Sequence, residues 1–242
     1  MNLSKNHIKL ITSLQQKKYR QKHKLFIAEG LKVVNELLNS SVVLEKLFVT
    51  NDCELKVPSE KKVILTSVEL KKISQLKTPN KVLGLFHIPK EKKAASKGLI
   101  VVLDAINDPG NLGTIIRLCD WFGVLQLVCS NETVDCYNQK VVQASMGSLT
   151  RIDIVYTDLK TYLKETNLPV FAADMNGENI YTFDLPKEAI LIMGNEANGI
   201  SDELMSLIAN KISIPQFGAS QKTESLNVAT ATAVLLSEFK RR

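Results

Sequence analysis

The sequence lacks several features that define common classes of protein. No apolar run approaches the roughly 18 residues needed to span a membrane, and the longest, residues 99–103, has the length of a buried strand. The first residues are polar and lack the apolar core of a secretory signal, so we expect a cytoplasmic protein. The 4 cysteines show no Cys-x-x-Cys pair and no other zinc spacing, so we expect no metal site. No Gly-x-Gly-x-x-Gly follows a predicted strand, which argues against an ordinary Rossmann-type nucleotide enzyme.

Charge is distributed unevenly along the 242 residues. Residues 1–98 hold 20 Lys/Arg and 8 Asp/Glu, a net charge of +12, whereas residues 99–242 hold 11 and 17, a net charge of −6. A strongly basic module suits a polyanion, because each phosphate that Lys or Arg neutralises releases condensed counterions. An acidic module tethered to it suits chemistry on a small ligand.

The pattern of apolar residues predicts two domains. Residues 1–90 form a small α/β unit, in which residues 3–38 predict two helices and short strands follow at residues 44–49, 63–65 and 82–87. Residues 91–98 are polar and weakly patterned, which is typical of a linker. Residues 99–242 form the second domain.

Strands and helices alternate in the second domain. The predicted strands are residues 99–103, 125–129, 152–156, 170–173, 189–193 and 212–214, and the predicted helices are residues 112–122, 139–146 and 225–240. Alternation of this kind predicts an α/β fold with a parallel sheet covered by helices. Ligands of such sheets bind beyond the carboxyl ends of the strands.

The first polar segment at such an end follows residue 103 and enters a helix. Asn111 is expected to cap that helix at its N-terminus, and Arg117 follows inside it. Taken alone, Arg117 is also compatible with an ordinary surface arginine. A guanidinium on a helix that starts at a ligand-facing loop could instead hold a phosphate.

Two further segments follow later strands. Gly194-x-Glu196-x-x-Gly199 comes directly after residues 189–193, and a helical turn capped by Ser201 is expected after it. Ser225-Leu226-Asn227 opens the last helix, where capping alone could explain Ser225 or Asn227. Capping does not account for Glu196.

The three segments together resemble the signature motifs of the SpoU/TrmH family of RNA ribose methyltransferases, of the SPOUT class. They share the order and approximate separation of Asn111 with Arg117, then Gly194-x-Glu196-x-x-Gly199, then Ile214-Pro215 with Ser225-Leu226-Asn227-Val228. The resemblance covers residues 99–242. Residues 25–32 resemble the family's RNA-binding extension, a ribosomal-protein-like α/β fold.

The resemblance implies a C-terminal trefoil knot, a homodimer and S-adenosylmethionine as the methyl donor. The residues implied to catalyse the reaction are Arg117, Asn111, Glu196, Ser225 and Asn227, with Arg117 reaching the site of the partner subunit. Those implied to bind the donor are Met193, Gly194, Gly199, Ile214, Pro215 and Leu226. Residues 216–224 are longer and more polar than the family's usual bridge at this place, which indicates a different substrate edge.

A basic run near the N-terminus is the candidate contact with the RNA backbone: Lys17, Lys18, Arg20, Lys22 and Lys24. A lone run of charges could equally be a solvated helix face, but the +12 balance favours RNA. We expect ribosomal RNA as the substrate, with transfer RNA next. The alternative is a catalytically silent RNA-binding or ribosome-assembly protein with the same fold.

Overall fold

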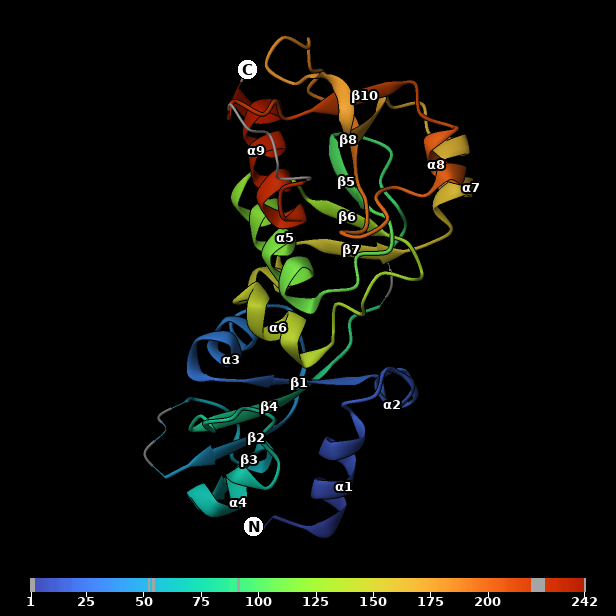
Figure 1. Cartoon of the computed structure of the whole chain (residues 1–242). Coiled ribbons are helices and arrows are strands. Elements are labelled where there is room, and N and C mark those ends of the chain that lie inside the picture. The colour runs from blue at the N-terminus through green and yellow to red at the C-terminus, as the bar shows by residue number, and fades with distance from the viewer. Residues whose placement is uncertain (1–2, 52, 54, 91, 219–224, 242) are drawn as a thin grey trace. The chain divides into compact units, whose positions relative to one another are not determined.

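The computed structural model describes residues 3–51, 53, 55–90, 92–218 and 225–241 (Figure 1). Tertiary contacts divide the chain into two compact units. The first comprises Met1–Lys90 and Asp135–Thr150, and the second comprises Glu91–Val134 and Arg151–Arg242. The sequence placed residues 135–150 in the second domain, whereas their contacts group them with the first unit.

The first unit is built on a mixed four-stranded sheet in the order β1-β4-β2-β3. Its elements are α1 (Lys5–Ser13), α2 (Lys17–His23), β1 (Leu25–Glu29), α3 (Leu31–Leu38), β2 (Leu44–Thr50), η1 (Ser59–Lys61), β3 (Lys62–Leu65), α4 (Ser67–Lys71), β4 (Val82–His87), α6 (Gln139–Ser145) and η2 (Ser148–Thr150). The pairs β1/β4 and β2/β4 are antiparallel, whereas β2/β3 is parallel.

The prediction of two helices over residues 3–38 missed strand β1. All five of its residues are buried, and it pairs along its length with β4. Gly30 then adopts a φ of +90°, a conformation that other residues rarely reach, and separates β1 from α3. A continuous apolar run on both faces does not distinguish a buried strand from a helix, which explains the error.

Segment Asp135–Thr150 completes the hydrophobic core of the first unit. Val142 of α6 is buried in one cluster with Phe26 of β1 and Phe86 of β4, and Tyr137 packs against the same cluster. The Gln139 amide also donates a hydrogen bond to the buried carboxylate of Glu29. These contacts are why the segment belongs to this unit.

The second unit contains a six-stranded sheet in the order β10-β8-β9-β5-β6-β7, and every neighbouring pair is parallel. Its strands are β5 (Leu99–Leu103), β6 (Gln126–Cys129), β7 (Asp153–Tyr156), β8 (Val170–Asn179), β9 (Ala189–Met193) and β10 (Asn210–Ser213). Its helices are α5 (Pro109–Trp121), α7 (Leu159–Glu165), α8 (Asp202–Met205) and α9 (Val228–Arg241). The predicted α/β architecture with a parallel sheet is confirmed.

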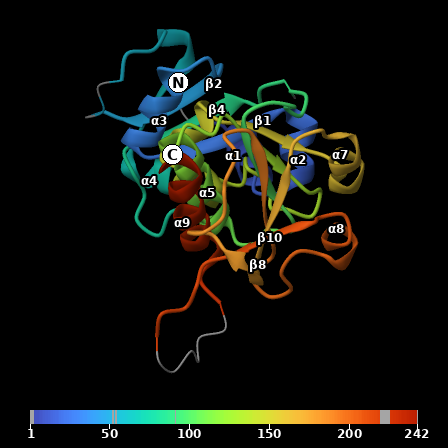
Figure 2. The same ribbon diagram turned by 90° about the horizontal axis from the view of Figure 1, so that it is seen from above.

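Helices cover both faces of this sheet, which buries the central strands completely. Every residue of β5 and β9 is buried, as expected for strands at the centre of a parallel sheet. Helices α5 and α9 pack side by side on one face (Figures 1 and 2). Leu159, Leu163 and Leu204, from α7 and α8, pack against Ile100 and Ile190 on the other. Across the described ranges, no helix is both long and apolar enough to cross a membrane.

Residues 92–98, the described part of the predicted linker, are fastened to the second unit. The Ala95 N–H donates to the Gln126 side-chain carbonyl, and the Tyr162 hydroxyl donates to the Ala95 carbonyl (3.0 Å). Ala94 and Ala95 also pack against the core beside α7. The described part of the predicted linker therefore packs against the second unit through its small residues.

The thiol of Cys119 is expected to be inert in the folded protein. Cys119 is fully buried in α5, and this burial raises its pKa to about 12. At pH 8 the thiol is therefore protonated, and the thiolate that reacts with alkylating reagents is not formed. Mass spectrometry after N-ethylmaleimide treatment should find Cys119 unmodified in the native protein and modified in urea. Rapid labelling of Cys119 in the native protein would contradict this expectation.

Candidate active site at the carboxyl edge of the parallel sheet

The turn after β5 leads into helix α5 and presents Asn111 at the edge of the sheet. The cap of α5 is Asp108, whose side chain accepts a hydrogen bond from the Asn111 N–H (2.8 Å). Asn111 was predicted to be the cap, which was wrong because Pro109 starts the helix two residues earlier, in the position that proline favours. The side chain of Asn111 is consequently available for other contacts.

The loop after β9 is a tight turn that carries Glu196 at its exposed tip. Asn195 and Gly199 exchange two backbone hydrogen bonds across it (2.9 and 2.8 Å). A Cβ on Gly194 would lie 2.2 Å from the carbonyl carbon of Gly199, so only glycine allows this approach. Gly199 itself has a φ of +68°. The Gly194-x-Glu196-x-x-Gly199 pattern thus has a structural reason for both glycines.

The N-terminus of α9 presents Asn227 at the same edge. The Asn227 side-chain oxygen accepts hydrogen bonds from the N–H groups of Ala229 (3.0 Å) and Thr230 (3.2 Å). The helix begins at Val228 rather than at the predicted residue 225, because the Asn227 cap defines its start. Ser225 precedes the helix and is exposed.

Three predicted site residues from these three segments form one hydrogen-bonded chain. The Asn227 amide nitrogen donates to the side-chain oxygen of Asn111 (2.9 Å), and the Asn111 amide nitrogen donates to Glu196 (2.5 Å). Capping fixes the orientation of the Asn227 amide, because only its oxygen can accept from backbone N–H groups. Each amide therefore donates towards the next residue, and the chain ends on a carboxylate, which only accepts.

Arg117 and Ser225 take no part in the hydrogen bonds that link Asn227, Asn111 and Glu196. The side chain of Arg117 is exposed on α5, whereas Arg20, Arg151 and Arg241 each pair with a carboxylate. Within the described part of the chain, the side chain of Arg117 has no hydrogen bond or ion pair. Its guanidinium is thus available to an external anion.

Of the residues predicted to bind the donor, Met193 is buried and the others are at least partly exposed. Leu226 exposes 50% of its surface, and Ile214 and Pro215 are half-buried after β10. Among the described residues, the backbone groups of Ile214 and Leu226 make no hydrogen bond. Uncovered apolar side chains beside available backbone groups fit an adenine ring, which needs both. Residues 219–224, most of the segment predicted to form a different substrate edge, lie outside the described residues.

The predicted RNA-binding run divides into exposed and buried members. Lys17, Lys18, Lys22 and Lys24 are exposed. Arg20 is only 3% exposed; its guanidinium pairs with Asp135 (2.5 Å) and donates to the carbonyls of Leu14 and Gln15 (2.8 Å each). The prediction that Arg20 contacts RNA was wrong, because its donors are used inside the first unit.

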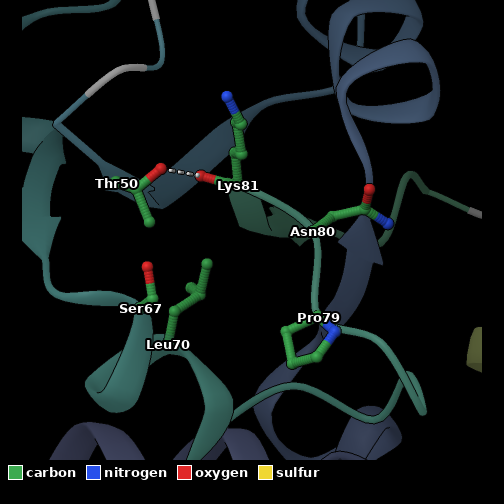
Figure 3. Close-up of a pocket in the computed structure, with 6 residues that line it drawn as sticks. All are labelled: Thr50, Ser67, Leu70, Pro79, Asn80 and Lys81. Atoms are coloured by element: carbon green, nitrogen blue, oxygen red, sulfur yellow. Dashed lines mark hydrogen bonds between the residues drawn. The ribbon is translucent and has the colours of Figure 1, made fainter.

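One cavity in the first unit has none of the predicted site residues. It measures about 250 Å³ and is lined by Thr50, Ser67, Leu70, Pro79, Asn80 and Lys81 (Figure 3). The side chains of Asn80 and Lys81 point away from its centre in this view. Its polar groups therefore do not converge on one position, and we assign no ligand to it.

Sequence reasoning missed two residues that hold the edge of the sheet together. Buried Asp104, directly after β5, accepts a hydrogen bond from the Ser201 N–H (2.8 Å). Asn195 donates from its side chain to the Ala105 carbonyl (2.7 Å). Asp104 could have been noticed, because a carboxylate at the end of an apolar strand is costly to bury without a partner.

Most of the chain matches characterised families. Residues 98–237 match the SpoU rRNA Methylase family, and residues 5–84 match the MRM3-like substrate binding domain. The chain is 31% identical to a 23S rRNA (guanosine(2553)-2'-O)-methyltransferase, RlmP, of Bacillus subtilis, over 94% of this chain and 93% of that protein. It spans a smaller share of other curated relatives, such as 44% of the mitochondrial rRNA methyltransferase 3 of Xenopus laevis, at 33% identity over 69% of this chain.

Two solved structures have a fold similar to that of this protein over nearly its whole length. A putative RNA methyltransferase of the TrmH family from Porphyromonas gingivalis is 37% identical, with a TM-score of 0.88 over 99% of this chain and 98% of that one. An AdoMet-bound rRNA methyltransferase from Sinorhizobium meliloti is 28% identical, with a TM-score of 0.85 over 100% of this chain and 97% of that one.

Proposed function

The chain belongs to the SpoU rRNA Methylase family, and from this membership we propose that it transfers a methyl group from S-adenosylmethionine to a ribose 2'-hydroxyl of ribosomal RNA. The observation that carries the proposal for this site is the hydrogen-bonded chain of Asn227, Asn111 and Glu196. Each residue comes from a different motif, and the residues meet where ligands of parallel sheets bind. The substrate class follows from relatives that act on ribosomal RNA.

The chemistry requires few polar groups. Bound S-adenosylmethionine supplies an already activated methyl group, so the protein has to align the ribose oxygen and help remove its proton. Arg117 binds the phosphate beside the target ribose and stabilises the developing negative charge on the oxygen. A guanidinium with a pKa above about 12 is poorly suited to accept a proton, so we do not assign Arg117 as the base.

The remaining motif residues position these groups. Asn111 and Asn227 hold the edge of the site through their amides, and Glu196 accepts the last hydrogen bond of the chain. Ser225, which is exposed and precedes α9, contacts the ribose or the phosphate in this proposal. The donor lies against Met193 at the end of β9, Gly194 and Gly199 of the loop that follows, and Ile214, Pro215 and Leu226 after β10.

We also propose that the C-terminal segment forms a trefoil knot and that two copies of the chain pair in the cytoplasm. In the dimer, Arg117 of one copy reaches the site of the other. Arg117 and Trp121 are both exposed on α5, and Trp121 exposes 84% of its surface. This exposure supports the proposal that a second copy of the chain covers α5. The exposure of Trp121 excludes it from the core of a single copy.

The proposed function is tested by mapping ribose methylation in ribosomal RNA from cells with and without this protein. We expect at least one 2'-O-methyl group to disappear in its absence and to return when the purified chain and S-adenosylmethionine are added. Calorimetry with S-adenosylmethionine distinguishes a methyltransferase from the alternative, a catalytically silent RNA-binding protein. The silent protein would not need to bind the donor. Unchanged methylation together with absent donor binding would exclude the proposal.

The four exposed lysines of the first unit are expected to contact the RNA backbone. Replacing Lys17, Lys18, Lys22 and Lys24 by glutamine should weaken RNA binding and lower the dependence of log K on log salt by up to about 0.9 per lost phosphate contact. A filter-binding salt titration of the full chain measures both quantities.

A matched control removes four positive charges from the second unit. Lys164, Lys187, Lys211 and Lys240 are also exposed, and their replacement by glutamine lowers the net charge equally. We expect this control to retain the salt dependence of the original chain. Equal losses in both variants would show that only total charge matters.

A further inference from the structure

Two loops at the carboxyl edge of the sheet exchange side-chain hydrogen bonds in both directions. Asp104, from the turn after β5, accepts from the Ser201 N–H beyond the glycine loop (2.8 Å). Asn195, from the glycine loop, donates to the Ala105 carbonyl in the turn after β5 (2.7 Å). The turn after β5 leads to Asn111 and Arg117, whereas the glycine loop carries Glu196. The exchange therefore connects the segments on which the proposed reaction depends.

The side chain of Asn195 has one possible orientation. Its oxygen accepts from the N–H groups of Ala197 (2.9 Å) and Asn198 (3.1 Å). Since neither N–H can accept a hydrogen bond, the amide nitrogen must face Ala105, whose carbonyl can only accept. All of these partners are backbone groups. Asn195 thus holds the loop that carries Glu196 at a fixed distance from the turn after β5.

The turn at the other end of this contact is also held firmly. Ala105 has a φ of +54°, a left-handed conformation that residues other than glycine seldom adopt. Its N–H donates to the Ser130 hydroxyl (3.0 Å), and Ser130 is buried. Asp104 donates from its backbone to the Met193 carbonyl (2.9 Å). A non-glycine residue stays in this conformation only when its surroundings fix it.

We propose that Asn195 and Asp104 are positioning residues, which set the placement of Glu196 relative to Asn111 and thereby the alignment of the ribose at this edge. The proposal rests on the proposed function of this site. Loss of either contact leaves every motif residue present but lets the two loops move apart. A displacement of about 1 Å can lower the rate of an aligned reaction about 100-fold.

The sharpest test is Asn195→Asp in the full chain. The variant keeps an oxygen that accepts from the Ala197 and Asn198 N–H groups but replaces the donor to Ala105 by a second acceptor. The matched control is Asn198→Asp, the same chemical change three residues along the loop, on an exposed side chain that has no hydrogen bond among the described residues. Thermal unfolding of both variants tests whether they are folded.

Two measurements decide the outcome. For Asn195→Asp, we expect kcat for methyl transfer to fall about 10- to 100-fold with little change in the KM for RNA. In spectra of 15N-labelled protein, the Asn111 side-chain amide should exchange its protons with water faster than in the original chain. A kcat and an exchange rate equal to those of Asn198→Asp would overturn the proposal. The exchange measurement needs no activity, so it remains decisive even if the original chain methylates no RNA.

A second pair of variants covers the case in which Asn195→Asp does not fold. Asp104→Asn retains an oxygen for the Ser201 N–H, whereas Asp104→Ala leaves that donor without a partner. We expect Asp104→Asn to restore most of the kcat that Asp104→Ala loses and to restore slow exchange of the Asn111 amide. Equal kcat values and equal exchange rates in the two variants would contradict a positioning role.

Discussion

Replacing Arg117 by alanine is expected to lower kcat for methyl transfer at saturating donor by at least about 100-fold. The guanidinium supplies permanent charge next to the oxygen that becomes negative, and within the described residues it has no carboxylate to neutralise it. Donor binding should change little, because Arg117 lies outside the proposed donor surface. A methyl-transfer assay with tritiated donor, together with calorimetry of donor binding, measures both effects.

The control for this variant is Arg151→Ala. Arg151 is also a partly exposed arginine of the second unit, but its guanidinium pairs with Asp120 (2.9 Å). We expect Arg151→Ala to keep kcat near that of the original chain. Near-original methylation by an Arg117→Ala protein that binds the donor would remove Arg117 from the reaction.

Replacing Arg20 by alanine is expected to destabilise the first unit by about 3–5 kcal/mol. The change leaves the mostly buried carboxylate of Asp135 without its partner and removes the donors to the Leu14 and Gln15 carbonyls. Amide hydrogen exchange of the buried strand β1, followed by mass spectrometry, reports the free energy of opening of this unit.

Lys22→Ala is the control for Arg20→Ala, because Lys22 is exposed on the same helix and its loss should cost less than about 0.5 kcal/mol. The double variant Arg20→Ala with Asp135→Asn should be less destabilised than the sum of the two single changes, since it leaves no unpaired charge. Additive losses would show that the ion pair itself contributes nothing.

The arrangement of the second unit could be predicted because its central strands are apolar on both faces. Residues 99–103 and 189–193 were placed correctly from that feature alone. Parallel strands end at one edge, so the polar segments that follow them had to lie near each other. Asn111, Glu196 and Asn227 were expected at one site for that reason, and the structure places them within hydrogen-bonding distance.

What the sequence could not indicate depends on contacts between distant residues. The basic run gives no sign of which side chain turns inwards, and the partner of Arg20 lies 115 residues further along the chain. Helix α6 continues the strand and helix alternation of the second unit, so nothing local distinguishes it from the helices that cover the large sheet. The hydrogen bonds of Asp104 with the Ser201 N–H and of Asn195 with the Ala105 carbonyl join loops 97 and 90 residues apart, and no sequence pattern connects residues at such separations.

Each of the two units is built from two separate stretches of the chain, which limits how the units can be separated or exchanged. Because Asp135–Thr150 belongs to the first unit, the backbone passes between the units three times, and no single cut releases either one intact. A fragment ending at Lys90 would leave Arg20 without Asp135 and the cluster around Phe26 without Val142. Such a fragment should aggregate or remain partly unfolded. If recombination replaced only residues 1–90 with those of a relative, the new residues would have to pack against the original segment Asp135–Thr150. A functional exchange would therefore need a matching α6 as well.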